Sequence, residues 1–69
     1  MNSHAIEKAI EAAGGVSTLA GVVGVTRQAV EQWVKSARVP AERVLEIERA
    51  TAGRVTRHEL RPDLYPENS

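Results

Sequence analysis

The sequence has no cysteine and no phenylalanine, and among its 69 residues it holds one tryptophan and one tyrosine. Without cysteine, neither disulfide bonds nor thiolate metal sites can supplement the core of so small a chain. No apolar run approaches the roughly 20 residues that a membrane span needs, and residues 1–13 lack the basic start and apolar run of a signal peptide. We therefore expect residues 1–69 to form a single small cytoplasmic domain with no membrane partner.

An excess of charge of either sign is also missing, because nine Lys+Arg balance nine Asp+Glu. Zero net charge is not the usual signature of a nucleic-acid-binding protein. The charges are nevertheless unevenly placed, since residues 26–38 carry three basic side chains and one acidic side chain. Positive charge is thus concentrated in one short segment.

What the chain does contain is a series of short segments with helical periodicity, separated by glycine and proline. Ser3 is a suitable N-cap for the first helix, and Thr56 with Glu59 has the spacing of a capping box. The expected helices extend from the Ser3 cap to residue 13, over 16–23, over about 27–35, over 40–51, and from residue 56 to before Pro62, with an irregular tail over 62–69. No useful run alternates with period two, so the predicted fold class is all-α, with five short helices.

Residues 16–35 meet the demands of a helix-turn-helix motif. Two short helices that cross over a tight turn need a small side chain at the crossing, and Ala20 lies one turn before Gly24, which permits positive φ. The apolar positions that anchor both helices to one core are Leu19, Val23, Val25, Val30 and Trp33. An exposed tryptophan could stack on a ligand, but the inward spacing of Trp33 favours core packing.

Polar side chains remain on the outer face of the segment 27–35. Arginine suits the O6/N7 edge of guanine and glutamine the N6/N7 edge of adenine. The expected base-contacting residues are Arg27, Gln28, Gln32 and Glu31. Glu31 has two interpretations, because it can accept from cytosine N4 or pair with Arg27 or Lys35, and the pairing is favoured. The expected DNA backbone contacts are Ser17, Thr18, Thr26, Lys35, Arg38 and Arg43. For Lys35 and Arg38 the alternative is that they only keep the surface soluble.

The remaining reactive side chains indicate neither a catalytic site nor a metal site. His4 and His58 have no carboxylate or thiol at ligand spacing, so we expect neither a metal site nor a cofactor. Arg61 beside Asp63 is interpreted first as a local ion pair that fixes the tail, and a partner-binding role is the alternative. No nucleophile and base, phosphate loop or carboxylate pair stands at a credible position, so we expect no enzyme and no small-molecule ligand.

A family resemblance covers the chain from about Ile6 to Tyr65. Its residues are Leu19, Ala20, Gly24, Val25, Thr26, Gln28, Ala29, Val30, Trp33, the run Val39-Pro40-Ala41-Glu42-Arg43, Ile47, Glu48, Thr51, Ala52, Gly53, Val55, Thr56 and the run Leu60-Arg61-Pro62-Asp63. This pattern resembles the small Cro-like helix-turn-helix proteins of prophages, often called YdaS-type antitoxins. The resemblance implies a lambda-repressor-like DNA-binding domain that acts as a transcriptional regulator. The chain departs from the family at Gly21, where a helix former is commoner, and at Ser36-Ala37, where glycine is commoner.

These observations predict a sequence-specific repressor that binds double-stranded DNA and reads the major groove with the helix 27–35. Because one small domain with zero net charge makes few phosphate contacts, we expect a homodimer, formed in solution or only on DNA. Its candidate contact surfaces are the exposed faces of the fourth and fifth helices. The alternative is that the same scaffold binds a protein partner, such as a toxin or a regulator, with weak or no DNA binding.

Overall fold

The computed structural model describes residues 4–66 and folds them into helices and turns. The elements in chain order are α1 (His4–Ala13), α2 (Val16–Val23), α3 (Arg27–Ser36), the short 3₁₀ turn η1 (Ala41–Arg43), α4 (Val44–Ala50) and α5 (Arg57–Leu60). The described residues contain no strand, which confirms the all-α prediction of five short helices. Ser3, the predicted cap of the first helix, lies outside the described residues.

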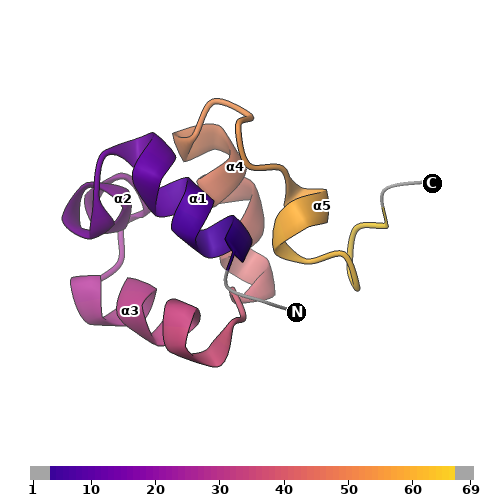
Figure 1. Cartoon of the computed structure of the whole chain (residues 1–69), viewed down its shortest axis with the longest axis horizontal. Helices are drawn as coiled ribbons and strands as arrows, with labels where there is room; N and C mark the ends of the chain where they lie inside the picture. The colour runs from indigo at the N-terminus through magenta and orange to yellow at the C-terminus, as the bar shows by residue number, and fades with distance from the viewer. Residues whose placement is uncertain (1–3, 67–69) are drawn as a thin grey trace.

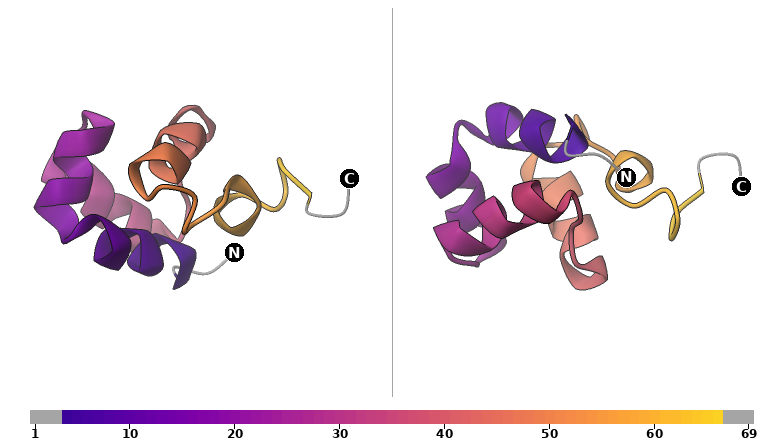
Figure 2. Two further views of the ribbon diagram at one scale, coloured as in Figure 1. Left: turned by 90° about the horizontal axis from the view of Figure 1, so that it is seen from above. Right: turned by 60° about the horizontal axis from the view of Figure 1, so that its bottom comes forward.

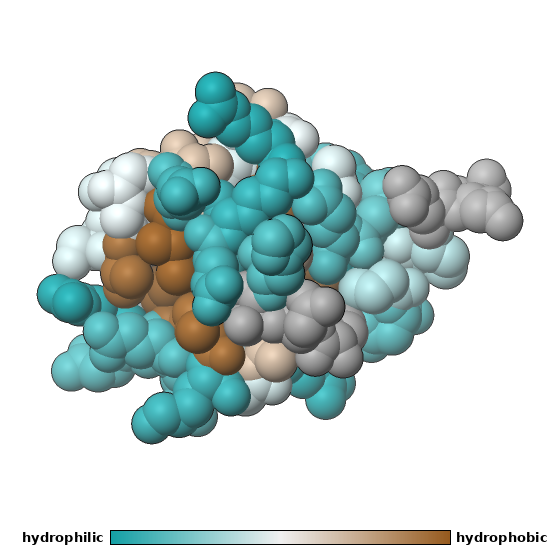
Figure 3. All heavy atoms as spheres, viewed as in Figure 1, coloured by the Kyte–Doolittle hydropathy of each residue, from teal (hydrophilic) through white to brown (hydrophobic). Residues whose placement is uncertain are grey.

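The helices pack around α2, which contacts α1, α3 and α4, while α5 closes the other end against α1 and α4. Figures 1 and 2 show α2 and the C-terminal turn at opposite ends of the long axis. Figure 3 shows hydrophilic side chains over most of this face, with apolar side chains reaching the surface between α1 and α3. The longest helices have ten residues, and none in the described part of the chain has the length and apolar character of a membrane span.

One apolar cluster forms the core, and it includes all five helices. Trp33 is 6% exposed, so the prediction that it packs inside is confirmed. Two core residues come from outside the helices, because Val39 and Val55 lie in the loops before η1 and α5 and are fully buried. Burying a valine side chain contributes about 1.5–3 kcal/mol, so these loops hold the helices together as well as connect them.

The fourth helix is shorter than the sequence predicts at both ends. It begins with a 3₁₀ turn because the Arg43 amide donates to the Pro40 carbonyl, three residues back, at 2.9 Å. It ends at Ala50, where the buried Thr51 folds its hydroxyl back and donates to the Ile47 carbonyl at 3.0 Å. Local side-chain bonding of this kind competes with continued helix.

The last helix begins with the predicted capping box. The Glu59 amide donates to Thr56 Oγ1 at 3.3 Å, and Glu59 Oε2 accepts from the Thr56 amide at 3.4 Å. Lys8 Nζ donates to Glu59 Oε1 at 3.2 Å, which ties α5 to α1. Partial burial raises the pKa of Glu59, but the hydrogen bonds from Lys8 and Thr56 outweigh it and leave that pKa below its ordinary value. From residue 62 to 66 the chain forms turns without a helix, and the rest of the predicted tail, 67–69, lies outside the described residues.

Candidate nucleic-acid interface

The turn between α2 and α3 has the geometry that the sequence predicts. Ala20 is buried at the end of α2, and Gly24 adopts a left-handed conformation with φ 87°. The amides of Gly24 and Val25 both donate to the Ala20 carbonyl, at 2.8 and 2.9 Å. This closure gives the Ala20 carbonyl two donors and turns the chain sharply into α3, against which α2 packs.

The orientation of α3 is fixed by its cap and its buried side. Thr26 Oγ1 accepts from the Ala29 amide at 3.1 Å, which starts the helix, and Val30 and Trp33 are buried. The opposite side of α3 is therefore exposed. At its C-terminal end Ala37 stands in the left-handed region with φ 57°, a conformation that favours glycine.

All four predicted base-contacting residues lie exposed on α3. Gln28 and Gln32 make no side-chain hydrogen bond within residues 4–66, so their amides are available to a ligand. Arg27 Nε donates to Glu31 Oε2 at 3.0 Å, which is the pairing that the sequence favoured for Glu31. Such an exposed pair contributes only about 0.3–0.5 kcal/mol, so another acceptor can replace the carboxylate at little cost.

The predicted backbone-contacting residues come from three elements. Ser17 and Thr18 lie exposed in the first turn of α2, where the N-cap Gly15 offers no side-chain oxygen to the free amides. Thr26, Lys35 and Arg38 are exposed at the two ends of α3. Arg43 differs from the others, because it is half-buried and donates to Glu46 Oε1 at 3.0 Å.

A buried contact that the sequence did not predict fixes the loop after α3. Arg61 is 4% exposed, and its Nη1 donates to the Val39 carbonyl at 2.8 Å. Its other nitrogens bind both carboxylate oxygens of Asp63, at 3.0 and 2.8 Å. The hydrogen bonds from Arg61 lower the pKa of Asp63 to about 2, aided by the positive charge of Arg38, and the same pair raises the pKa of Arg61. The expected ion pair is confirmed.

Neither His4 nor His58 belongs to a cluster of metal-ligating side chains in the described part of the chain. No cluster of three or more His, Cys, Asp or Glu side chains is present within residues 4–66. His58 Nδ1 instead lies 2.9 Å from the Tyr65 carbonyl oxygen, and Arg57 stands 5.7 Å from the centre of the Tyr65 ring. These contacts hold the C-terminal turn on α5.

The model of the family described as "Bacterial toxin YdaS" matches residues 6–69. The chain belongs to this family. This membership confirms the resemblance seen in the sequence, although the family is described as a toxin rather than an antitoxin.

This YdaS-family chain is also similar to two individual proteins. It is 44% identical over 63 residues to the candidate transcriptional regulator YdaS of Escherichia coli (strain K12), an alignment that covers 90% of this chain and 64% of that protein. The chain thus spans just under two thirds of the length of this relative. Its structure matches the Cro protein from a candidate prophage element, Xfaso 1, in Xylella fastidiosa strain Ann-1, with TM-score 0.87 and 49% identity over 94% of this chain and 97% of that chain. The predicted Cro-like fold is confirmed.

Proposed function

We propose that this chain is a sequence-specific DNA-binding regulator of the Cro type, which inserts α3 into the major groove. The observation that carries the proposal is the exposed polar face of α3, with Gln28 and Gln32 unengaged and the helix held from behind by Val30 and Trp33. A helix so presented fits the major groove of B-DNA, where amide side chains can distinguish base pairs. A protein with this role acts in the cytoplasm, where the DNA is.

The residues of the interface divide into two roles. Gln28 and Gln32 read base edges, and Arg27 exchanges Glu31 for a guanine when the chain docks. Lys35 and Arg38 contact phosphates and carry no sequence information. The remaining predicted phosphate contacts are the first turn of α2, with Ser17 and Thr18, the cap Thr26 and, after release from Glu46, Arg43.

Two copies of the chain bind one operator in this proposal. Zero net charge weakens long-range attraction to DNA, and a chain with a radius of gyration of 10.7 Å reaches few phosphates. A two-fold operator with half-sites about 10–10.5 bp apart would double the contacts.

The first experiment is a selection from a random duplex DNA library at moderate salt, followed by sequencing of the retained pool. Enrichment of a two-fold motif with half-sites about one helical turn apart is the expected result. Absence of any enriched motif, also at low salt, would contradict the proposal.

Variants then test the two roles. We expect Gln28→Ala to relax preference at one base pair at a cost of about 1–3 kcal/mol, since its amide reads one base. Arg38→Ala should weaken all sequences alike and reduce the slope of log K against log salt by about 0.9. Arg54→Ala is the matched control, because Arg54 is an exposed arginine that lies beside α1 and has no side-chain partner within residues 4–66. Equal effects of Arg38→Ala and Arg54→Ala would contradict the phosphate contact.

A second candidate function is favoured by the Arg27–Glu31 pair and by the zero net charge. The same exposed face would then bind a protein, such as a toxin or a regulator, with weak or no DNA binding. The family description as a toxin and the regulator name of the relative correspond to different roles in the cell. The DNA selection separates the two functions, because a partner-binding module enriches no DNA motif.

A further inference from the structure

The outer face of α4 carries a stripe of exposed side chains that nothing covers in the described part of the chain. Glu42, Leu45 and Arg49 follow one another at spacings of three and four residues, so they share one side of η1 and α4, and Ala52 is exposed in the turn that follows α4. Leu45 is 37% exposed, one of three large apolar side chains exposed within residues 4–66. The stripe thus has an acid at one end, an apolar centre and a base beyond it.

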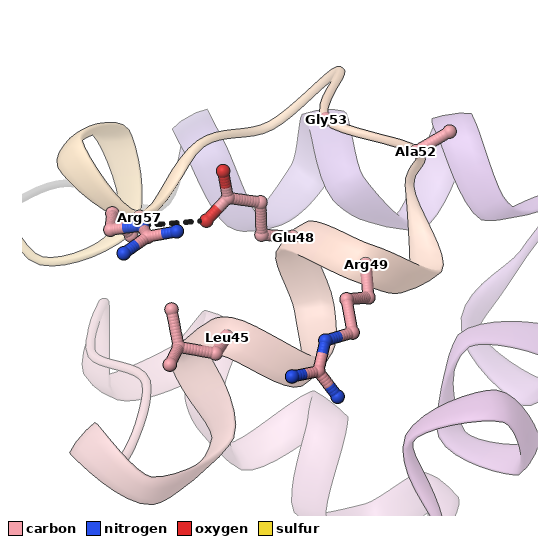
Figure 4. A pocket seen from close by; sticks show the side chains of 6 residues that line it. All are labelled: Leu45, Glu48, Arg49, Ala52, Gly53 and Arg57. Carbon is pink, nitrogen blue, oxygen red and sulfur yellow. Dashed lines mark hydrogen bonds and ion pairs between the residues drawn. The ribbon is translucent and has the colours of Figure 1, made fainter.

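Figure 4 shows the part of this face that holds Leu45, Arg49 and Ala52. Leu45 and Arg49 project from α4 beside a shallow hollow that the loop with Ala52 completes. A second shallow hollow lies on the other side of Arg49, where the 61%-exposed Val22 of α2 lies near Ala50. Arg49 therefore lines both hollows, each of which also has an exposed apolar side chain, Leu45 or Val22.

The two charged ends of the stripe have no partner of their own. Neither Glu42 nor Arg49 makes a side-chain hydrogen bond or ion pair within residues 4–66. Their neighbours are paired, since Arg43 binds Glu46 at 3.0 Å and Arg57 binds Glu48 at 2.9 Å. One unpaired acid and one unpaired base thus flank the exposed leucine.

We infer that this stripe is the interface between two copies of the chain, with the α4 helices antiparallel and Leu45 at the two-fold axis. Glu42 lies three residues before Leu45 and Arg49 four residues after it, about 4.5–6 Å along a helix axis on each side. A two-fold axis through Leu45 therefore sets Arg49 of each copy against Glu42 of the other. The order of charged and apolar side chains along the face is therefore complementary to itself under a two-fold rotation.

A second copy fits this face better than DNA or a lipid surface does. DNA and anionic lipids attract a face of net positive charge, whereas the Glu42–Leu45–Arg49 stripe has none. No residue of α3 lines either hollow, so the DNA-reading face stays free when α4 is covered. The inference rests on the proposed function in one respect, because a two-fold operator calls for two copies.

The size of the face sets the expected affinity of one copy for another. A specific interface buries about 500 Å² or more on each copy, roughly an eighth of the 4258 Å² surface of this chain. The stripe and Val22 give a modest apolar contact, so association in solution is weak. Neighbouring half-sites on DNA strengthen it by raising the local concentration.

A charge swap tests the pairing. The variants are Glu42→Arg, Arg49→Glu and the double variant, studied as full chains by sedimentation equilibrium without DNA. We expect each single change to weaken self-association at least about tenfold, because two attractive pairs become two repulsive ones. The double variant restores it. An equimolar mixture of the two single variants forms a species of twice the 7.5 kDa chain mass, because both cross pairs are attractive again.

The control mixture is Glu11→Arg with Arg54→Glu, which has the same net charges on exposed, unpaired residues elsewhere. It should not associate more than the wild type, and thermal unfolding establishes that every variant is folded. Single variants that associate as the wild type does would overturn the inference, as would recovery in the control mixture.

If the wild type stays monomeric in solution, the same variants are compared when bound to DNA. The measurement is then cooperativity on paired half-sites of the selected motif against binding to one half-site. Loss of cooperativity in the single variants and its return in the double variant, each measured relative to the same variant's binding to one half-site, support the interface. Unchanged cooperativity overturns it while leaving the proposed function intact. If the DNA selection enriches no motif, the proposed function is overturned. If the wild type is also monomeric at every concentration in solution, the interface is overturned as well.

Discussion

Replacing Arg61 by methionine tests whether the C-terminal turn contributes to the stability of the fold. Arg61 is buried, and its Nη1 donates to the carbonyl of Val39, itself fully buried, at 2.8 Å. Methionine retains an unbranched apolar stem but has no donor. The substitution therefore leaves the Val39 carbonyl buried without its partner.

The expected loss follows from the cost of that unpaired carbonyl. An unsatisfied buried acceptor costs about 1–3 kcal/mol, and a hydrogen bond from a charged donor is worth about 1.5–3 kcal/mol. The two figures overlap, and removing the buried guanidinium recovers part of its desolvation cost, so the net loss is about 2 kcal/mol. A chain of 69 residues has a total stability of about 3.5–10 kcal/mol. The midpoint of thermal unfolding should fall by about 8–16 °C.

Urea unfolding followed by tryptophan fluorescence measures this loss, because Trp33 is the one tryptophan of the sequence and lies in the core. Arg54→Met is the matched control, since it removes an exposed arginine and should change the free energy of unfolding by less than about 0.5 kcal/mol. Asp63→Asn keeps the donor to Val39 and should cost less than Arg61→Met. An Arg61→Met variant as stable as the Arg54→Met control would refute the reasoning.

Three further predictions concern stability. Gly21→Ala should raise the free energy of unfolding, measured in urea, by about 0.5–1 kcal/mol, because Gly21 is exposed within α2 and an added Cβ meets no atom within 4 Å. A lower free energy of unfolding would contradict this. Ala37→Gly should also stabilise the fold, by up to about 1 kcal/mol, because glycine adopts the left-handed conformation without the steric strain of alanine, and this gain outweighs the added entropy of the unfolded chain. A lower midpoint of thermal unfolding would disprove it. The pKa of Asp63 is about 2 in the folded chain against an ordinary 3.8, so its contribution is present above about pH 4 and is lost as the pH falls towards 2. Acid titration of stability should therefore be flatter in Asp63→Asn over that range, and parallel curves would count against the Arg61 contact.

Much of the candidate site could be predicted because its signals are local. Helix periodicity, the Thr26 cap and the Gly24 turn act over four residues or fewer, and each specifies its own segment. The four predicted base-contacting residues accordingly lie exposed on α3. The half-buried, paired state of Arg43 was not predictable in this way, because the 3₁₀ turn that places it depends on how the loop before it packs.

The sequence by itself determined the helices, their order and the buried side of α3, since helix periodicity and caps are properties of neighbouring residues. Only the tertiary structure decided which loop residues complete the core. Val39 and Val55 carry no periodic signal, and Arg61 meets the Val39 carbonyl across 22 positions. The tertiary structure also decided that the outer face of α4 stays exposed. A contact between distant segments depends on how whole helices pack, and no local pattern encodes the partner of a backbone carbonyl.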